Sequence, residues 1–118
     1  MKLFLVEGNY KNPIPLGGLK LDNLMKKYLD IIREETKDER ILFFGMKKDL
    51  TGTLLIMKGK DIEEIEKVTK SDLLYKKHIL VYNIKEFICK EYNEKFNDWF
   101  SIWRNYVFSK VDVKKFMI

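Results

Sequence analysis

The hydrophobic positions of the chain follow two different periodicities. Four short runs, at residues 2–6, 41–44, 53–58 and 78–87, are rich in apolar, aromatic and β-branched residues. Such runs, bounded by glycine and charged residues, are typical of β-strands. The sequence therefore predicts four strands.

Two helices are predicted between these strands. After Asp22, which can serve as a cap, apolar residues recur on one helical side, namely Leu21, Leu24, Met25, Tyr28, Ile31 and Ile32. The second helix follows Asp61, which with Glu64 resembles a capping box. Residues 71–77 are expected to form a turn or a short helical segment.

The resulting order, βαββαβ, indicates an α+β ferredoxin-like fold with an antiparallel sheet and both helices on one face. Residues 1–88 are predicted to form this domain, and residues 89–118 a C-terminal helical extension on the same domain or on a dimer partner. The extension carries an aromatic stripe at helical spacing, formed by Tyr92, Phe96, Trp99, Phe100, Trp103, Tyr106 and Val107. This stripe either contributes to the core or caps a ligand pocket.

The predicted strands do not alternate between apolar and polar residues, as a sheet with one solvated face would. Leu3 and Leu5 oppose Phe4 and Val6, and the other strands repeat this pattern. Because monomers seldom expose so large an apolar surface, the second face needs a cover. A second copy of the sheet, in a face-to-face dimeric α/β barrel, is favoured over the C-terminal helix.

Composition narrows the class of protein. A chain of 118 residues with 46% apolar residues has the size of one domain and excludes disorder as the overall state. The net charge is +5, but only three of the 23 basic residues are arginine, which argues against nucleic-acid binding.

No apolar run is long enough to span a membrane. The single cysteine, Cys89, suits a reducing compartment, and a cytoplasmic location is expected.

Residues 2–87 also resemble the YCII-related (YciI-like) family of the dimeric α/β-barrel superfamily. The resemblance rests on the opening Lys-Leu-Phe-Leu-Val-Glu-Gly, on Lys37-Asp38-Glu39-Arg40-Ile41-Leu42 followed by Gly45, on Ser71-Asp72-Leu73 in place of the usual Asp-Pro, and on the closing Val81-Tyr82-Asn83-Ile84-Lys85-Glu86-Phe87. It implies a homodimer and cofactor-free proton transfer or elimination on small, often aromatic, compounds. The family uses a histidine of the first helix with an acidic partner.

In this chain Tyr28 occupies the position of that histidine, counted back from Gly45, and Asp72 matches the acidic position. A phenol is a poor base at neutral pH, whereas imidazole titrates in the useful range. His78, the only histidine, is a candidate substitute for the missing base. The predicted site is therefore Tyr28, Asp72 and His78, although Tyr28 could be a core residue, Asp72 a helix cap and His78 a surface residue.

Other candidates carry weaker signals. Glu7 ends an apolar strand and could lie near a pocket or in solvent, and Cys89 has no neighbour that would activate its thiol. One histidine and one cysteine cannot form a His/Cys metal site, and no phosphate-binding glycine loop is present, so no metal or cofactor is expected.

Two hypotheses follow: a cofactor-independent lyase or isomerase for a small organic acid or phenol, and a non-catalytic ligand-binding or interaction module.

Overall fold

Residues 1–96 of the chain are described by the computed structural model. Their elements follow the order β1 (Lys2–Tyr10), α1 (Gly18–Lys37), β2 (Ile41–Met46), β3 (Gly52–Gly59), α2 (Ile62–Lys70), α3 (Leu73–Lys76) and β4 (Leu80–Phe87). Contacts divide the chain into two units, Met1–Ile88 and Cys89–Ile118, and all seven elements lie in the first unit.

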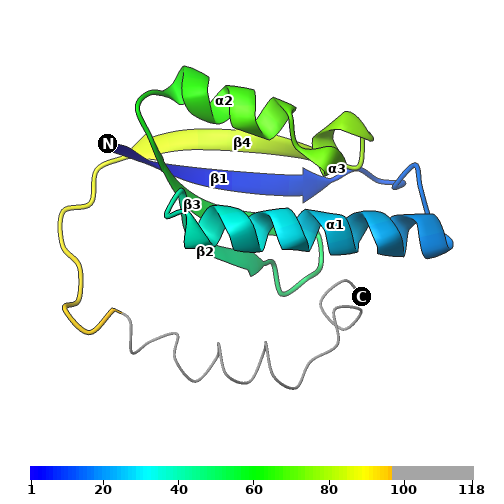
Figure 1. Ribbon diagram of the computed structural model, residues 1–118, viewed down its shortest axis with the longest axis horizontal. Coiled ribbons are helices and arrows are strands. Elements are labelled where there is room, and N and C mark those ends of the chain that lie inside the picture. Colours follow the sequence, from blue (N-terminus) through cyan, green and yellow to red (C-terminus); the bar gives the residue numbers. More distant parts are fainter. Residues whose placement is uncertain (97–118) are drawn as a thin grey trace. The chain divides into compact units, whose positions relative to one another are not determined.

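The four strands form one antiparallel sheet in the order β2-β3-β1-β4 (Figure 1). α1 packs against β2, and α2 packs against β3 and β4. The sheet therefore has its two edges at β2 and β4, with β1 and β3 in the middle. This arrangement confirms the α+β ferredoxin-like fold.

The first helix begins earlier than predicted. Gly17, not Asp22, is the N-cap of α1, and its backbone is extended at that position. Gly18 then has a φ of 61°, a conformation that glycine adopts without steric cost. The prediction of Asp22 as a cap was wrong because this backbone geometry, rather than a side-chain acceptor, sets the helix start.

The cap of the second helix is confirmed. Asp61 Oδ1 accepts a hydrogen bond of 2.9 Å from the backbone N–H of Glu64. Glu64 reaches back, and its Oε2 accepts from the backbone N–H of Lys60 over 2.6 Å. Asp61 is thus the cap of α2, whereas the Glu64 side chain binds the N–H of Lys60, one residue before the Asp61 N–H that a capping box uses. The predicted short helical segment is present as α3.

Every strand differs from prediction in at least one boundary: β2 ends at Met46 instead of at residue 44, and β3 is one residue longer at each end. β1 continues through Gly8 to Tyr10, because the ladders to β3 and β4 extend past the expected stop. β4 begins at Leu80 instead of at His78. His78 has a φ of 58°, which is incompatible with a strand, and belongs to the turn that follows α3.

The core lies between the sheet and the helices. Alternate residues of the central strands point to this side and are fully buried, among them Phe4, Val6, Leu55 and Met57. The helices add their own buried positions, which are Met25, Tyr28, Leu29, Ile32, Ile65, Thr69 and Leu74.

The opposite face of the sheet is apolar only in part. Leu3, Leu5, Leu54 and Ile56 are half-buried there, whereas the β4 positions on this face include the exposed Asn83 and Lys85. Lys47 also bridges two residues of β1 on this face: its Nζ lies 3.1 Å from Glu7 Oε2 and donates to Asn9 Oδ1 over 2.7 Å. This ion pair was not predicted from the sequence.

The predicted aromatic helix lies mostly outside the described residues. Of its stripe, only Tyr92 and Phe96 are described, and residues 88–96 contain a turn at 94–96 but no helix. Among the described helices, none has both the length and the apolar character needed to cross a bilayer.

Candidate functional site

A chain of hydrogen bonds joins Tyr28, Tyr82 and Asp72 on the helix side of the sheet. The two phenol oxygens lie 3.4 Å apart, and the Tyr82 hydroxyl donates to Asp72 Oδ2 over 3.0 Å. Because the single proton of Tyr82 is used for Asp72, Tyr28 is the donor to Tyr82. The three groups come from α1, β4 and the N-cap of α3, which are distant in sequence.

Asp72 is held in place by its capping role. Its Oδ2 accepts hydrogen bonds from the backbone N–H groups of Leu74, at 3.1 Å, and Tyr75, at 3.2 Å. These two bonds and the bond from Tyr82 all reach Oδ2, so none of the three uses Oδ1. The two alternatives for Asp72, a helix cap and a site residue, are therefore compatible.

Burial shifts the pKa values of all three groups upward. Desolvation raises the pKa of Asp72 above its ordinary 3.8, and the hydrogen bond from Tyr82 opposes this effect. Desolvation also raises the pKa values of the Tyr28 and Tyr82 phenols far above 10. At neutral pH both phenols therefore stay protonated and act as hydrogen-bond donors.

The packing around the phenols depends on Gly8. This glycine is the register partner of both Thr53 on β3 and Tyr82 on β4. A Cβ atom at Gly8 would come within 2.5 Å of Thr53 Oγ1 and 3.0 Å of a Leu80 methyl group. A residue without a side chain is thus required beside the site.

Two further hydroxyls near Tyr28 are buried without a hydrogen-bond partner in the described part of the chain, those of Tyr10 and Thr53. Thr53 is fully buried, and its hydroxyl lies close enough to Tyr28 to lower the pKa of that phenol. Burial raises the pKa of Tyr10 to about 12. The polar cluster therefore extends beneath α1.

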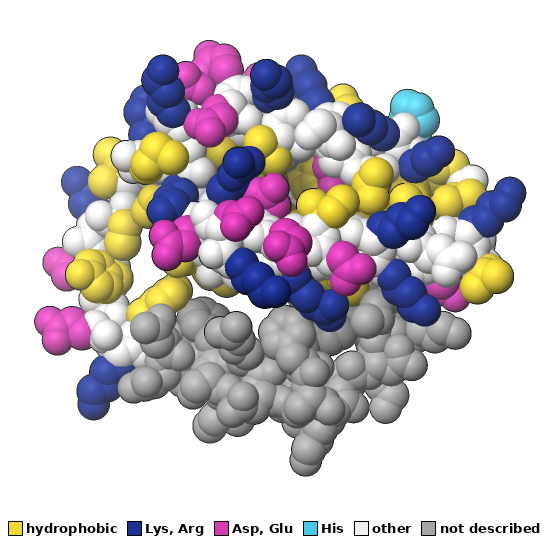
Figure 2. All heavy atoms as spheres, in the orientation of Figure 1, with side chains coloured by type: hydrophobic (Ala, Val, Ile, Leu, Met, Phe, Trp, Pro, Cys, Tyr) yellow, Lys and Arg dark blue, Asp and Glu magenta, His cyan; other side chains and the backbone are white. Residues whose placement is uncertain are grey.

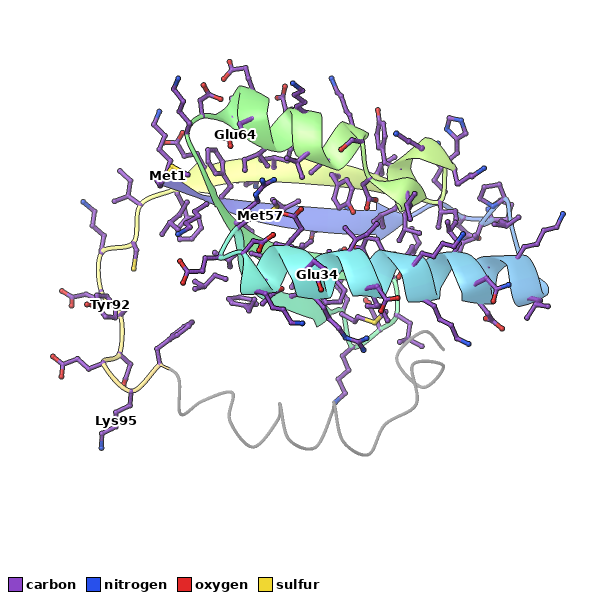
Figure 3. All side chains as sticks on the ribbon, in the orientation of Figure 1. Met1, Glu34, Met57, Glu64, Tyr92 and Lys95 are labelled. Carbon is purple, nitrogen blue, oxygen red and sulfur yellow. The ribbon has the colours of Figure 1, made fainter. Side chains whose placement is uncertain are left out.

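A pocket of about 160 Å³ opens between α1 and the end of α2, and Asp72 and Tyr82 belong to its wall. Its floor is formed by the buried side chains of Val6, Leu55 and Met57, and its rim includes the exposed Ile31. Figure 2 shows hydrophobic side chains between the charged rows of the two helices, and Figure 3 shows Met57 between them. An apolar cavity of about 150 Å³ can hold a benzene ring, so this pocket suits one small ring.

A second, more polar hollow of about 300 Å³ lies between α2 and β4. Tyr82 and Thr69 line both hollows, so they form the wall between them. The remaining lining of the second hollow includes Glu66, Lys70 and Asn83.

The structure brings Tyr28 and Asp72 together, through Tyr82, and leaves His78 apart. His78 is exposed in the turn before β4 and lines neither hollow. Glu7 lies on the opposite face of the sheet, where the hydrogen bond and charge of Lys47 lower its pKa. The thiol of Cys89 is free and exposed.

Sequence reasoning missed the role of Tyr82. The residue was placed in the correct strand, but its hydroxyl carried no signal until the neighbouring elements were known. Successive side chains of a strand point to opposite faces of the sheet, which puts Tyr82 on the same side of β4 as the buried Leu80. This alternation was the signal that could have placed Tyr82 on the helix side. In residues 1–96, no group of three or more His, Cys, Asp or Glu side chains is arranged to hold a metal ion.

No model of a protein family matches the chain, and no curated protein matches it. A solved structure resembles it: 5-chloro-2-hydroxyhydroquinone dehydrochlorinase (TftG) from Burkholderia phenoliruptrix AC1100, in complex with 2,5-dihydroxybenzoquinone. The match has a TM-score of 0.56 and 18% sequence identity, and covers 78% of this chain and 99% of that one. This similarity supports the α+β ferredoxin-like fold.

Proposed function

We propose that the protein is a cofactor-independent lyase or isomerase that acts on a small organic acid or phenol in the pocket beside Asp72. The observation that carries this proposal is the combination of an apolar floor with two carboxylates, those of Asp72 and Glu35, and the Tyr82 phenol in the wall of a ring-sized pocket. Ligand sites are commonly apolar cavities with a few convergent polar groups.

The polar groups have distinct roles in this proposal. Asp72 Oδ1, which the capping bonds leave unused, accepts a proton from the substrate, and a carboxyl with a raised pKa is better matched to proton transfer near neutral pH. Tyr82 donates to Asp72 and touches the bound ring. Tyr28 does not line the pocket and acts through Tyr82, as a positioning residue.

The comparison supports the size and chemistry of the ligand. The resembling structure holds 2,5-dihydroxybenzoquinone, a single oxygenated ring, in a protein of the same fold. A ring of this kind would place apolar faces against Val6 and Leu55 and an oxygen near Asp72.

A non-catalytic binding module is the alternative, and one observation favours it. The buried phenols of Tyr28 and Tyr82 stay protonated at neutral pH, so neither replaces the basic histidine of the YCII-related family. Asp72 is then the only described ionisable group in direct contact with both the pocket and the phenols.

The Asp72→Asn variant distinguishes the catalytic function from the non-catalytic binding function. One amide oxygen can accept the same three hydrogen bonds as Asp72 Oδ2, so the cap is kept while the base is lost. If the protein is an enzyme, Asp72→Asn abolishes turnover of a compound found by screening small phenols and organic acids, whereas binding of that compound persists. Asp49→Asn, in the exposed β2–β3 turn, is the control. Full turnover by Asp72→Asn would overturn the catalytic role.

We also propose that the chain is a YCII-related protein that forms a homodimer through the face of the sheet opposite the helices. Within the sheet, Leu5 of β1 is the register partner of Ile56 on β3, and Ile56 is also the register partner of Phe43 on β2. These three side chains create an apolar centre across three strands. None of the helices in residues 1–96 belongs to this face (Figure 1). The free thiol of Cys89 supports a cytoplasmic location.

Sedimentation measurements test the dimer. Ile56→Asp places a charge at the centre of this face and is expected to shift the protein from dimer to monomer. Leu19→Asp introduces the same charge at an exposed site of α1 and should leave the dimer intact. A wild-type protein that is monomeric at all concentrations would contradict the proposal.

A further inference from the structure

The pocket beside Asp72 is lined by negative charge. Among the described residues in its wall, the charged side chains are Asp72 and Glu35, and none is a lysine or an arginine. The chain as a whole, in contrast, carries a net charge of +5. Salt screens exposed charges that lie more than about 10 Å away, so the groups in the wall dominate the potential inside the pocket.

The charge of Glu35 is compensated. Its Oε2 atom is buried and lies 3.5 Å from Arg40 Nε. The backbone holds Arg40 in this place, because its N–H donates to the Glu35 carbonyl over 3.0 Å and its own carbonyl accepts from the Lys58 N–H over 3.0 Å. The ion pair is neutral as a whole, and it leaves Asp72 as the carboxylate that sets the charge of the pocket.

Asp72 has no cationic partner in residues 1–96. The three donors to its Oδ2 atom are uncharged, namely the backbone N–H groups of Leu74 and Tyr75 and the Tyr82 hydroxyl. The ion pairs formed within this range do not include Asp72. Its Oδ1 atom receives none of the three bonds, yet it is not enclosed without a donor as Glu35 Oε2 is, so a ligand can reach it.

Folding has already removed water from Asp72. Burial raises the pKa of this carboxyl above its ordinary 3.8, which reflects the loss of hydration around its charged form. The main cost of forming an ion pair in a partly buried site is the desolvation of both partners. At Asp72 much of this cost is met before a ligand arrives, so a bound cation would mainly lose its own hydration.

The end of α2 adds negative character to the same wall. Val68 and Thr69, in the last turn of α2, line the pocket, and the final carbonyl groups of a helix carry partial negative charge. The lysines of this turn, Lys67 and Lys70, are exposed and do not line it. Both Asp72 and the helix end therefore favour a positive group and oppose a negative one.

We propose that the pocket selects its ligand by charge: a phenol that carries an ammonium group binds best, an uncharged phenol binds less tightly, and a carboxylate binds most weakly. In the preferred ligand the ammonium group donates to Asp72 Oδ1, and the ring lies on the apolar floor formed by Val6, Leu55 and Met57. This inference rests on the proposed function and narrows its substrate class from organic acids and phenols to phenols, above all those with a cationic amine.

Isothermal titration calorimetry of the full-length chain at neutral pH tests this order. The probes share one ring and differ in the charge of one substituent: 4-hydroxybenzylamine is a cation, 4-hydroxybenzyl alcohol is neutral and 4-hydroxybenzoate is an anion. We expect the wild-type protein to bind the amine about tenfold more tightly than the alcohol, because hydrogen bonds between charged partners are the stronger ones. The benzoate should bind about tenfold more weakly than the alcohol.

The Asp72→Asn variant assigns the selectivity to its residue. One amide oxygen can accept the bonds that Asp72 Oδ2 receives, so the variant keeps the cap and removes the charge. The difference between the amine and the alcohol should largely disappear, while binding of the alcohol is kept. Asp49→Asn is the matched control, because it removes a carboxylate from the exposed β2–β3 turn, which lines neither hollow. Thermal unfolding establishes that each variant is folded.

The outcomes distinguish this inference from the proposed function. Equal affinities of the wild-type protein for the three probes, tightest binding of the benzoate, or an unchanged preference for the amine in Asp72→Asn would overturn the charge selectivity alone. Failure of all three rings to bind the wild-type protein would overturn the proposed function as well.

Discussion

The Tyr82 hydroxyl lies 3.0 Å from Asp72 Oδ2 and donates to it, which links the last strand of the sheet to the N-cap of α3. Tyr82 also separates the two hollows and receives the hydrogen bond from Tyr28. A single phenol therefore connects the cap, the pocket and the first helix.

Replacement of Tyr82 by phenylalanine removes the side-chain donor to Asp72. Because this hydrogen bond lowers the pKa of Asp72, we expect that pKa to rise further in Tyr82→Phe. The protein should also lose about 1 kcal/mol of unfolding free energy. Carboxyl carbon NMR titration measures the first effect and urea denaturation the second. Tyr92→Phe, at a side chain that is 77% exposed, is the control, and an unchanged Asp72 pKa in Tyr82→Phe would refute the coupling.

Asp72 should make the stability of the protein depend on pH. Its pKa is higher in the folded state than the ordinary 3.8, so the folded protein binds more protons between the two values. The free energy of unfolding therefore falls as the pH rises through this interval, and the loss persists at higher pH. Asp72→Asn lacks this contribution. We expect the wild-type protein to lose stability relative to Asp72→Asn as the pH rises above the ordinary pKa of 3.8, which urea denaturation at a series of pH values measures. A constant difference would contradict the raised pKa.

The close packing beside the phenols predicts a position that tolerates no side chain. Gly8→Ala places a methyl group against Thr53 and Leu80 and is expected to destabilise the protein by about 1–3 kcal/mol. Gly45→Ala is the matched control in another strand, since no atom lies within 4 Å of the added carbon. Equal stabilities of the two variants would show that the sheet relaxes around Gly8.

The predicted domain boundary can be tested by truncation. The strand ladders end at Phe87 and the buried hydrophobic residues identified lie between Phe4 and Leu80, so we expect residues 1–88 to fold without the remainder. Far-ultraviolet circular dichroism and urea denaturation of this fragment should show a cooperative transition. Loss of that transition would indicate that residues 89–118 contribute to the same folding unit.

Local sequence was sufficient for most of the fold. Asp61 accepts its predicted hydrogen bond from the N–H of Glu64 because a cap depends only on residues within one helical turn. The order of the predicted strands and helices along the chain, βαββαβ, likewise indicated the ferredoxin-like fold. The failures were boundaries: Gly17 and not Asp22 begins α1, and His78 adopts a left-handed conformation before β4, because backbone geometry at these points depends on packing beyond the local pattern.

Only part of the candidate site could be predicted from the sequence. The sequence predicted that Tyr28 and Asp72 share a site, and the structure brings them together, but the Tyr82 phenol that joins them was not predicted, since it does not stand out among its neighbours. The role of each depends on contacts between residues that are many positions apart.

By itself the sequence determined the order of the strands and helices in residues 1–88 and most of the apolar side of each helix, because periodicity and capping act over a few residues. Ile31, predicted on the apolar side of α1, is 46% exposed. Only the tertiary structure decided that Tyr82 would donate a hydrogen bond to Asp72 and that His78 would lie outside the pocket. Burial and hydrogen bonding set the chemistry of these groups, and both arise only when α1, α3 and β4 are brought together.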